Sequence, residues 1–137
     1  MKLNCVVSCL VIYGLRLVLA ILFNCSEPEA ITLALTQIKN HNDLSRQLTD
    51  KGIHLGAYAN RLTAVDPEWT LADSTAPQPL RQDLDEQRYW QDFVQGWISE
   101  FHVKIVGGCC GITPEHIAYL HAKLIENRKR GQEDEEE

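Results

Sequence analysis

The chain has 137 residues, of which 45% are hydrophobic and 23% are charged, a balance typical of one globular domain with a core. Its formal net charge is −6, to which the last five residues contribute five of the nineteen acidic side chains. The basic cluster at 128–130 is more typical of the solvated end of a helix than of a nucleic-acid site, so nucleic-acid binding is disfavoured. Residues 133–137 are all acidic. We therefore predict a charged, disordered tail over residues 129–137.

The five cysteines are an odd number, and Cys109 and Cys110 are adjacent. Adjacent cysteines seldom form a disulfide without strain, so this pattern disfavours a secreted, disulfide-bonded framework. Reduced thiols in a cytoplasmic protein, either buried or bound to a metal ion, fit the pattern better. Cys5 and Cys9 lie in an apolar N-terminal run and are expected to be inert.

Residues 5–23 form this apolar run and contain a single charged residue, Arg16. Read alone, the run resembles a signal peptide or a marginal membrane span. Arg16 near its middle disfavours the span, because a charge at the centre of a bilayer is costly. A cytoplasmic location is favoured, and a membrane-anchored or exported binding domain that uses residues 5–23 is the alternative.

Short apolar runs alternate with helical patterns along the rest of the chain. Buried strands are predicted over 18–23, 53–58 and 103–106, and helices over 28–38, 43–50, 89–101 and from Pro114 onward, with Thr113 as the cap. This alternation predicts an α/β fold with a parallel sheet and crossover helices. The aperiodic stretch from Arg61 to Asp85 is interpreted as a loop at the active-site end of the sheet.

Cysteines follow the first and the third predicted strands, and each is followed by a Pro-Glu helix start. Because the carboxyl ends of parallel strands meet on one face, the thiols of Cys25, Cys109 and Cys110 can converge there. Gly107 and Gly108 are expected to let the backbone bend toward this point. Three thiolates with a fourth position open describe a catalytic zinc site, yet spacing alone favours buried cysteines without a metal.

The segment from Val106 to Ile117, VGGCCGITPEHI, resembles the zinc-binding signature of the homocysteine S-methyltransferase family. Upstream, Asn24-Cys25 resembles the segment that supplies the family's first zinc ligand. Residues 56–60, GAYAN, resemble the Tyr-Pro-Asn segment of the intervening strand, with Ala59 in place of the proline.

This resemblance implies a partial TIM barrel, the last three βα units of a (β/α)8 barrel, with an extra apolar N-terminal segment. Residues 1–17 would lie outside the family, and residues 18–128 would be the C-terminal part of its homocysteine-binding domain. The implied cofactor is Zn²⁺, with the metal ligands Cys25, Cys109 and Cys110 and no catalytic residue beyond them. Asn24, Tyr58 and Asn60 are implied to bind substrate. The implied reaction transfers a methyl group from a donor such as S-methylmethionine to homocysteine, giving methionine.

A complete TIM barrel needs about 250 residues, so the first five strands are expected to be absent and the activity impaired. An inactive remnant of such an enzyme is therefore the alternative to a working methyltransferase. His54, His116 and His121 are expected to be packed or surface residues and not metal ligands.

Overall fold

The computed structural model describes residues 18–63 and 79–133. Its centre is a three-stranded parallel sheet in the order β1 (Ala20–Ser26), β2 (His54–Ala59) and β3 (Ile105–Gly108). The predicted α/β class and parallel sheet are confirmed, and this arrangement is compatible with part of a barrel. Each strand starts one or two residues later than predicted and runs further toward its carboxyl end. Cys25 therefore lies within β1, where the prediction had placed it after the strand.

Helices connect the strands in the predicted order. The helices α1 (Pro28–Asn40) and α2 (Asn42–Asp50) follow β1. A continuous helical run made of α3 (Glu86–Arg88), the π-helical turn η2 (Tyr89–Val94) and α4 (Gln95–Phe101) precedes β3. The last helix, α5, spans Pro114–Glu133. Residues 129–133, predicted to be disordered, are thus helical, and residues 134–137 lie outside the described part.

Local signals explain where these helices begin and end. Pro28 lies in the first turn of α1, where its missing N–H costs nothing. The Asp85 carboxylate accepts a hydrogen bond from the Arg88 backbone N–H and caps α3. Gly52 lies just after the end of α2 and has φ 63°, a left-handed conformation that glycine adopts without penalty.

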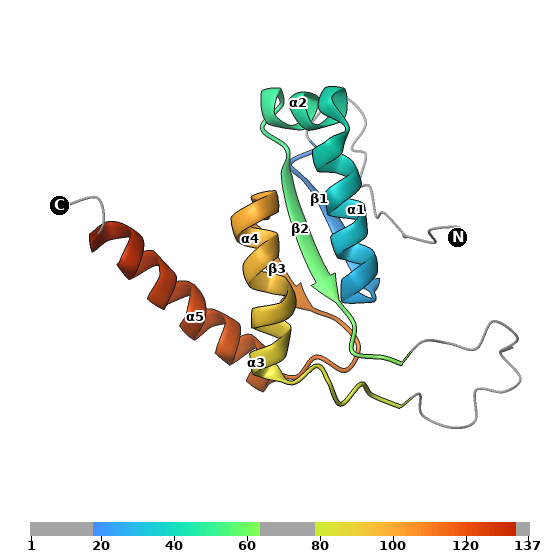
Figure 1. Cartoon of the computed structure of the whole chain (residues 1–137), viewed down its shortest axis with the longest axis vertical. Coiled ribbons are helices and arrows are strands. Elements are labelled where there is room, and N and C mark those ends of the chain that lie inside the picture. Colours follow the sequence, from blue (N-terminus) through green and yellow to red (C-terminus); the bar gives the residue numbers. More distant parts are fainter. Residues whose placement is uncertain (1–17, 64–78, 134–137) are drawn as a thin grey trace, which may run out of the picture.

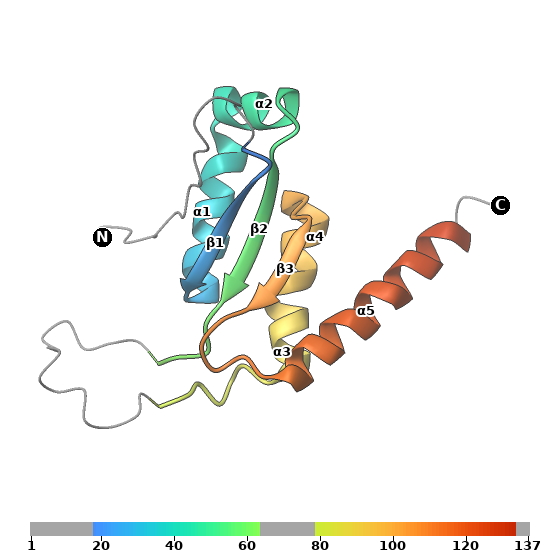
Figure 2. The same ribbon diagram turned by 180° about the vertical axis from the view of Figure 1, so that it is seen from behind.

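The helices α1 and α4 lie over one face of the sheet (Figure 1), and the opposite view shows the strands in front of them (Figure 2). The aromatic residues of the 89–101 helical run pack into or against the core. Trp97 is 1% exposed, and its indole N–H donates to Thr32 Oγ1 at 2.8 Å. The buried core consists of Phe23, Ile31, Ala34, Leu35, Ala57, Ala59, Leu84, Tyr89, Trp90, Val94, Trp97, Val103 and Leu120.

The apolar N-terminal run enters the described structure only at its end. Residues 5–17 lie outside the described ranges, and Ala20–Phe23 form the first part of β1. Among the helices of residues 18–63 and 79–133, none has the length and apolar character needed to cross a membrane.

Candidate metal centre

Three thiols meet at the carboxyl ends of β1 and β3. Cys25 Sγ lies 3.6 Å from Cys110 Sγ, and Cys109 Sγ lies 3.9 Å from Cys110 Sγ. All three sulfurs lie within 4.8 Å of one another. Tetrahedral zinc with Zn–S bonds of about 2.3 Å separates its sulfur ligands by about 3.8 Å. The separations of Cys110 Sγ from Cys25 Sγ and from Cys109 Sγ are both close to this value, and the donor set suits zinc.

Cys25 reaches the cluster through an irregular end of β1. The pairing of β1 with β2 shifts register between Asn24 and Ser26, and Cys25 adopts a left-handed conformation with φ 53°. This conformation costs a non-glycine residue roughly 1–2 kcal/mol. The carboxamide of Asn60, 8% exposed, helps to hold it: Nδ2 donates to the Cys25 carbonyl at 2.9 Å, and Oδ1 accepts from the Leu62 N–H at 3.1 Å.

Backbone hydrogen bonds fix the Cys109-Cys110 pair. The Cys109 N–H donates to the Ala59 carbonyl at 2.8 Å, and the Cys110 carbonyl accepts from the Arg61 N–H at 2.8 Å. The chain then turns at Gly111, which has φ 78°. Asn60 contacts the Cys25 side and Arg61 the Cys110 side, so the two residues that follow β2 hold both sides of the cluster.

The structure shows a packing role for Gly107 and Gly108, and the bend expected of them stays a prediction. Neither has a positive φ; the left-handed turn lies at Gly111. A Cβ on Gly107 would lie 2.8 Å from Tyr58 Cδ1, and a Cβ on Gly108 would overlap the Ile112 side chain. These glycines are required because neighbouring side chains already occupy the space beside the strand.

The thiols of the cluster differ in acidity. A hydrogen bond from the Cys109 thiol lowers the pKa of Cys25. Burial raises the pKa of Cys109 to about 11, and its hydrogen bond to Cys25 adds to this effect. In the absence of a cation, the Cys25 thiol is therefore the more acidic of these two thiols. A divalent cation at this point favours the thiolate form of its ligands, because its charge stabilises the anion.

The remaining predicted site residues lie around the same strand ends. Tyr58 is half-buried beside Gly107, and Asn24 is exposed on β1. The Asn60 carboxamide is already engaged by the backbone at Cys25 and Leu62, so its clearest role in the structure is to position Cys25. The substrate-binding roles of Asn24, Tyr58 and Asn60 stay predictions.

The histidines are packed or exposed, as expected. His54 and His121 are exposed. His116 is 0% exposed; its Nδ1 accepts from the Thr113 N–H at 3.3 Å, and its Nε2 lies 3.1 Å from the Leu84 carbonyl. Both ring nitrogens thus have partners within the protein, which explains why this imidazole can be buried.

Two residues important to the site were not identified from the sequence. Arg81, within the aperiodic stretch, binds the Glu29 carboxylate with both terminal nitrogens at 2.8 Å, and this hydrogen bonding lowers the pKa of Glu29. The second is Tyr89, the first residue of the predicted 89–101 helix; its hydroxyl donates to the Gly107 carbonyl at 2.8 Å and accepts from the Ala59 N–H at 3.4 Å. No local pattern marks either contact, since the partners are far apart in the sequence.

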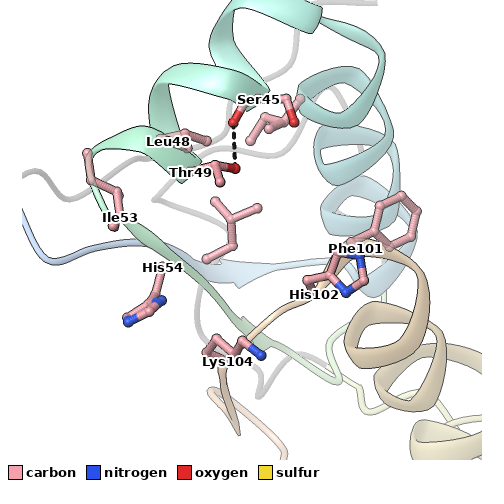
Figure 3. A pocket seen from close by; sticks show the side chains of 11 residues that line it. Ser45, Leu48, Thr49, Ile53, His54, Phe101, His102 and Lys104 are labelled. Carbon is pink, nitrogen blue, oxygen red and sulfur yellow. Dashed lines mark hydrogen bonds between the residues drawn. The ribbon is translucent and has the colours of Figure 1, made fainter.

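A cavity of about 370 Å³ lies at the other end of the strands, near the start of β2 (Figure 3). It is lined by Ile38, Ser45, Leu48, Thr49, Gly52, Ile53, His54, Leu55, Phe101, His102 and Lys104. None of the three clustered cysteines lines it. The thiol cluster and this cavity are therefore separate features at opposite ends of the sheet.

Two comparisons with known proteins give a match. The profile of the family described as Homocysteine S-methyltransferase matches residues 4–124, a range that begins inside the 1–17 segment set apart from the family above. A methionine synthase of Mycobacterium leprae (strain TN) is 34% identical over 74 residues, which is 52% of this chain and only 6% of the length of that protein. No solved structure gives a significant match. The chain belongs to the homocysteine S-methyltransferase family.

Proposed function

We propose that this chain binds Zn²⁺ through Cys25, Cys109 and Cys110 and methylates the thiol of homocysteine to give methionine. The observation that carries the proposal is the convergence of three sulfurs within 4.8 Å from two separate strand ends. Membership in the homocysteine S-methyltransferase family supports the substrate. The likeness to methionine synthase supports the product.

Three protein ligands are typical of catalytic zinc sites, which keep one coordination position for water or substrate. Zinc bound here would stabilise the thiolate of homocysteine near neutral pH. Cys25 and Cys110 are exposed, so a small substrate can reach the cluster from solvent. Asn24 and Tyr58, at the same strand ends, are proposed to contact the substrate, and Asn60 to do so while positioning Cys25.

The proposed donor is a sulfonium such as S-methylmethionine. The homocysteine sulfur attacks the methyl carbon after its proton has passed to solvent, and a new S–CH3 bond forms. The bond between the methyl group and the donor sulfur breaks, and its electron pair stays on that sulfur, which becomes a neutral thioether. The residues of the chain contribute by holding the attacking sulfur in its ionised form and in place.

Zinc content measured by elemental analysis tests the site. We expect one zinc per chain in the parent, loss of zinc in a Cys109→Ala, Cys110→Ala double variant, and retention in a Cys5→Ala, Cys9→Ala control. Formation of methionine from homocysteine and S-methylmethionine by the zinc-loaded chain tests the reaction. A loaded chain that forms no methionine would favour the inactive remnant, and a parent without zinc would overturn the proposed site.

A cytoplasmic location is part of the proposal, because a cluster of reduced thiols persists in a reducing compartment. Fractionation of cells that express the chain tests it. Recovery in the membrane fraction, or cleavage near residue 20, would instead support the alternative of an anchored or exported domain.

A further inference from the structure

The two sides of the thiol cluster belong to strands that do not touch. Cys25 lies on β1 and leads into α1, whereas Cys109 and Cys110 follow β3, and β2 lies between these strands. The separation of Cys25 from Cys110 therefore depends on contacts that connect β1 with β3 at the carboxyl end of the sheet. The chain that follows β2 provides these contacts.

Two short segments of this chain lie together over the strand ends. Leu62 and Leu80 form an antiparallel bridge. The Arg81 N–H donates to the Arg61 carbonyl at 2.9 Å, and Arg61 Nε donates to the Arg81 carbonyl at 2.7 Å. Arg61 in turn donates its N–H to the Cys110 carbonyl at 2.8 Å. Arg81 is thus connected to the Cys110 side of the cluster through Arg61.

The guanidinium of Arg81 makes the connection to the other side. Its two terminal nitrogens bind the two carboxylate oxygens of Glu29, each at 2.8 Å, and Glu29 lies in the first turn of the helix that follows Cys25. Asp83 also binds Arg81 Nη2, at 2.7 Å. The Arg81 side chain is 19% exposed, and this bidentate pair with Glu29 holds the planar guanidinium in one orientation.

We propose that Arg81 is a positioning residue of the metal centre. Its bidentate pair with Glu29 and its hydrogen bonds with Arg61 together hold Cys25 and Cys110 at the separation that a metal ion requires. This inference rests on the proposed zinc site. A cluster held in place before the metal arrives binds it more tightly, because less ordering remains to be done on binding. Loss of a residue that orients metal ligands typically lowers metal affinity by about 10- to 100-fold.

The test is the zinc affinity of the full chain, measured by competition with a chromophoric chelator, for the parent and for Arg81→Ala, Arg81→Lys and Glu29→Gln. The matched control is Arg46→Ala, which removes an arginine–aspartate pair with Asp43 on α2, away from the strand ends. Urea unfolding of each metal-free variant shows whether it folds. The absorption spectrum of the Co²⁺ form reports the geometry of the thiolate ligands.

We expect Arg81→Ala and Glu29→Gln each to lower zinc affinity by about 10- to 100-fold and to change the Co²⁺ spectrum, whereas Arg46→Ala matches the parent. The double variant Glu29→Gln, Arg81→Ala should bind zinc no more weakly than the weaker-binding single variant, because both changes disrupt the same bidentate pair. The zinc affinity of Arg81→Lys should lie between those of the parent and Arg81→Ala, since lysine keeps the charge but cannot form the bidentate pair.

Affinities within twofold of the parent in Arg81→Ala and Glu29→Gln would overturn the positioning role and leave the zinc site intact. A parent that binds no zinc would overturn both proposals. If Arg81→Ala does not fold, Glu29→Gln and Arg81→Lys decide the question, because each retains a polar partner at the same place.

Discussion

Zinc should stabilise the folded chain, because its ligands come together only in the folded state. Cys25 and Cys110 are 85 residues apart in the sequence, yet their sulfurs lie 3.6 Å apart. A ligand that binds only the folded state adds about 2.7 kcal/mol to the free energy of unfolding when its free concentration is 100 times Kd. Unfolding entropies of about 2.1 cal/mol/K per residue, applied to 137 residues, convert this gain into a rise in Tm of about 9 °C.

Calorimetry of the metal-free chain, with and without zinc at a known multiple of Kd, measures this rise. The Cys109→Ala, Cys110→Ala variant should show almost no rise, since a single thiol of the cluster remains. The Cys5→Ala, Cys9→Ala variant should behave as the parent does. An equal rise in the parent and in the Cys109, Cys110 variant would refute the reasoning, because zinc would then be acting elsewhere on the chain.

Tyr89→Phe should lower the free energy of unfolding by about 1–3 kcal/mol in urea titrations, because the Gly107 carbonyl loses its buried donor. Burial raises the pKa of Tyr89 from 10.0 to about 12, so its contribution to stability is fully present below pH 10 and is lost as pH rises through about 12. An alkaline stability profile of the parent should show this loss, and Tyr89→Phe should lack that part of it. Gly111→Ala should destabilise the metal-free chain more than Gly52→Ala and should also weaken zinc binding. Both glycines have positive φ, but only at Gly111 would the new Cβ meet neighbours, Leu80 Cδ2 at 2.6 Å and Arg61 Cβ at 3.0 Å. Equal zinc affinities for the two variants would contradict this.

The sequence alone predicted the elements that depend on local patterns. The 53–58 run reads as a strand because apolar and branched residues bounded by turn signals suit a buried strand, and β2 occupies nearly the same residues. Pro28 and Gly52 mark helix boundaries through their own backbone limits, which act wherever they occur. Because parallel strands place their carboxyl ends on one face, the meeting of Cys25 with Cys109 and Cys110 could also be predicted.

Only the tertiary structure decided how the cysteines are held. The left-handed conformation of Cys25 and its bond to Asn60 arise where β1 meets the chain after β2, and neither partner indicates the other in the sequence. The pairing of Arg81 with Glu29 joins residues 52 positions apart, and Arg81 lies in a stretch that has no period. Hydrophobic periodicity records which side of an element is buried, whereas such polar contacts depend on which distant backbone atoms the completed fold brings within hydrogen-bonding distance.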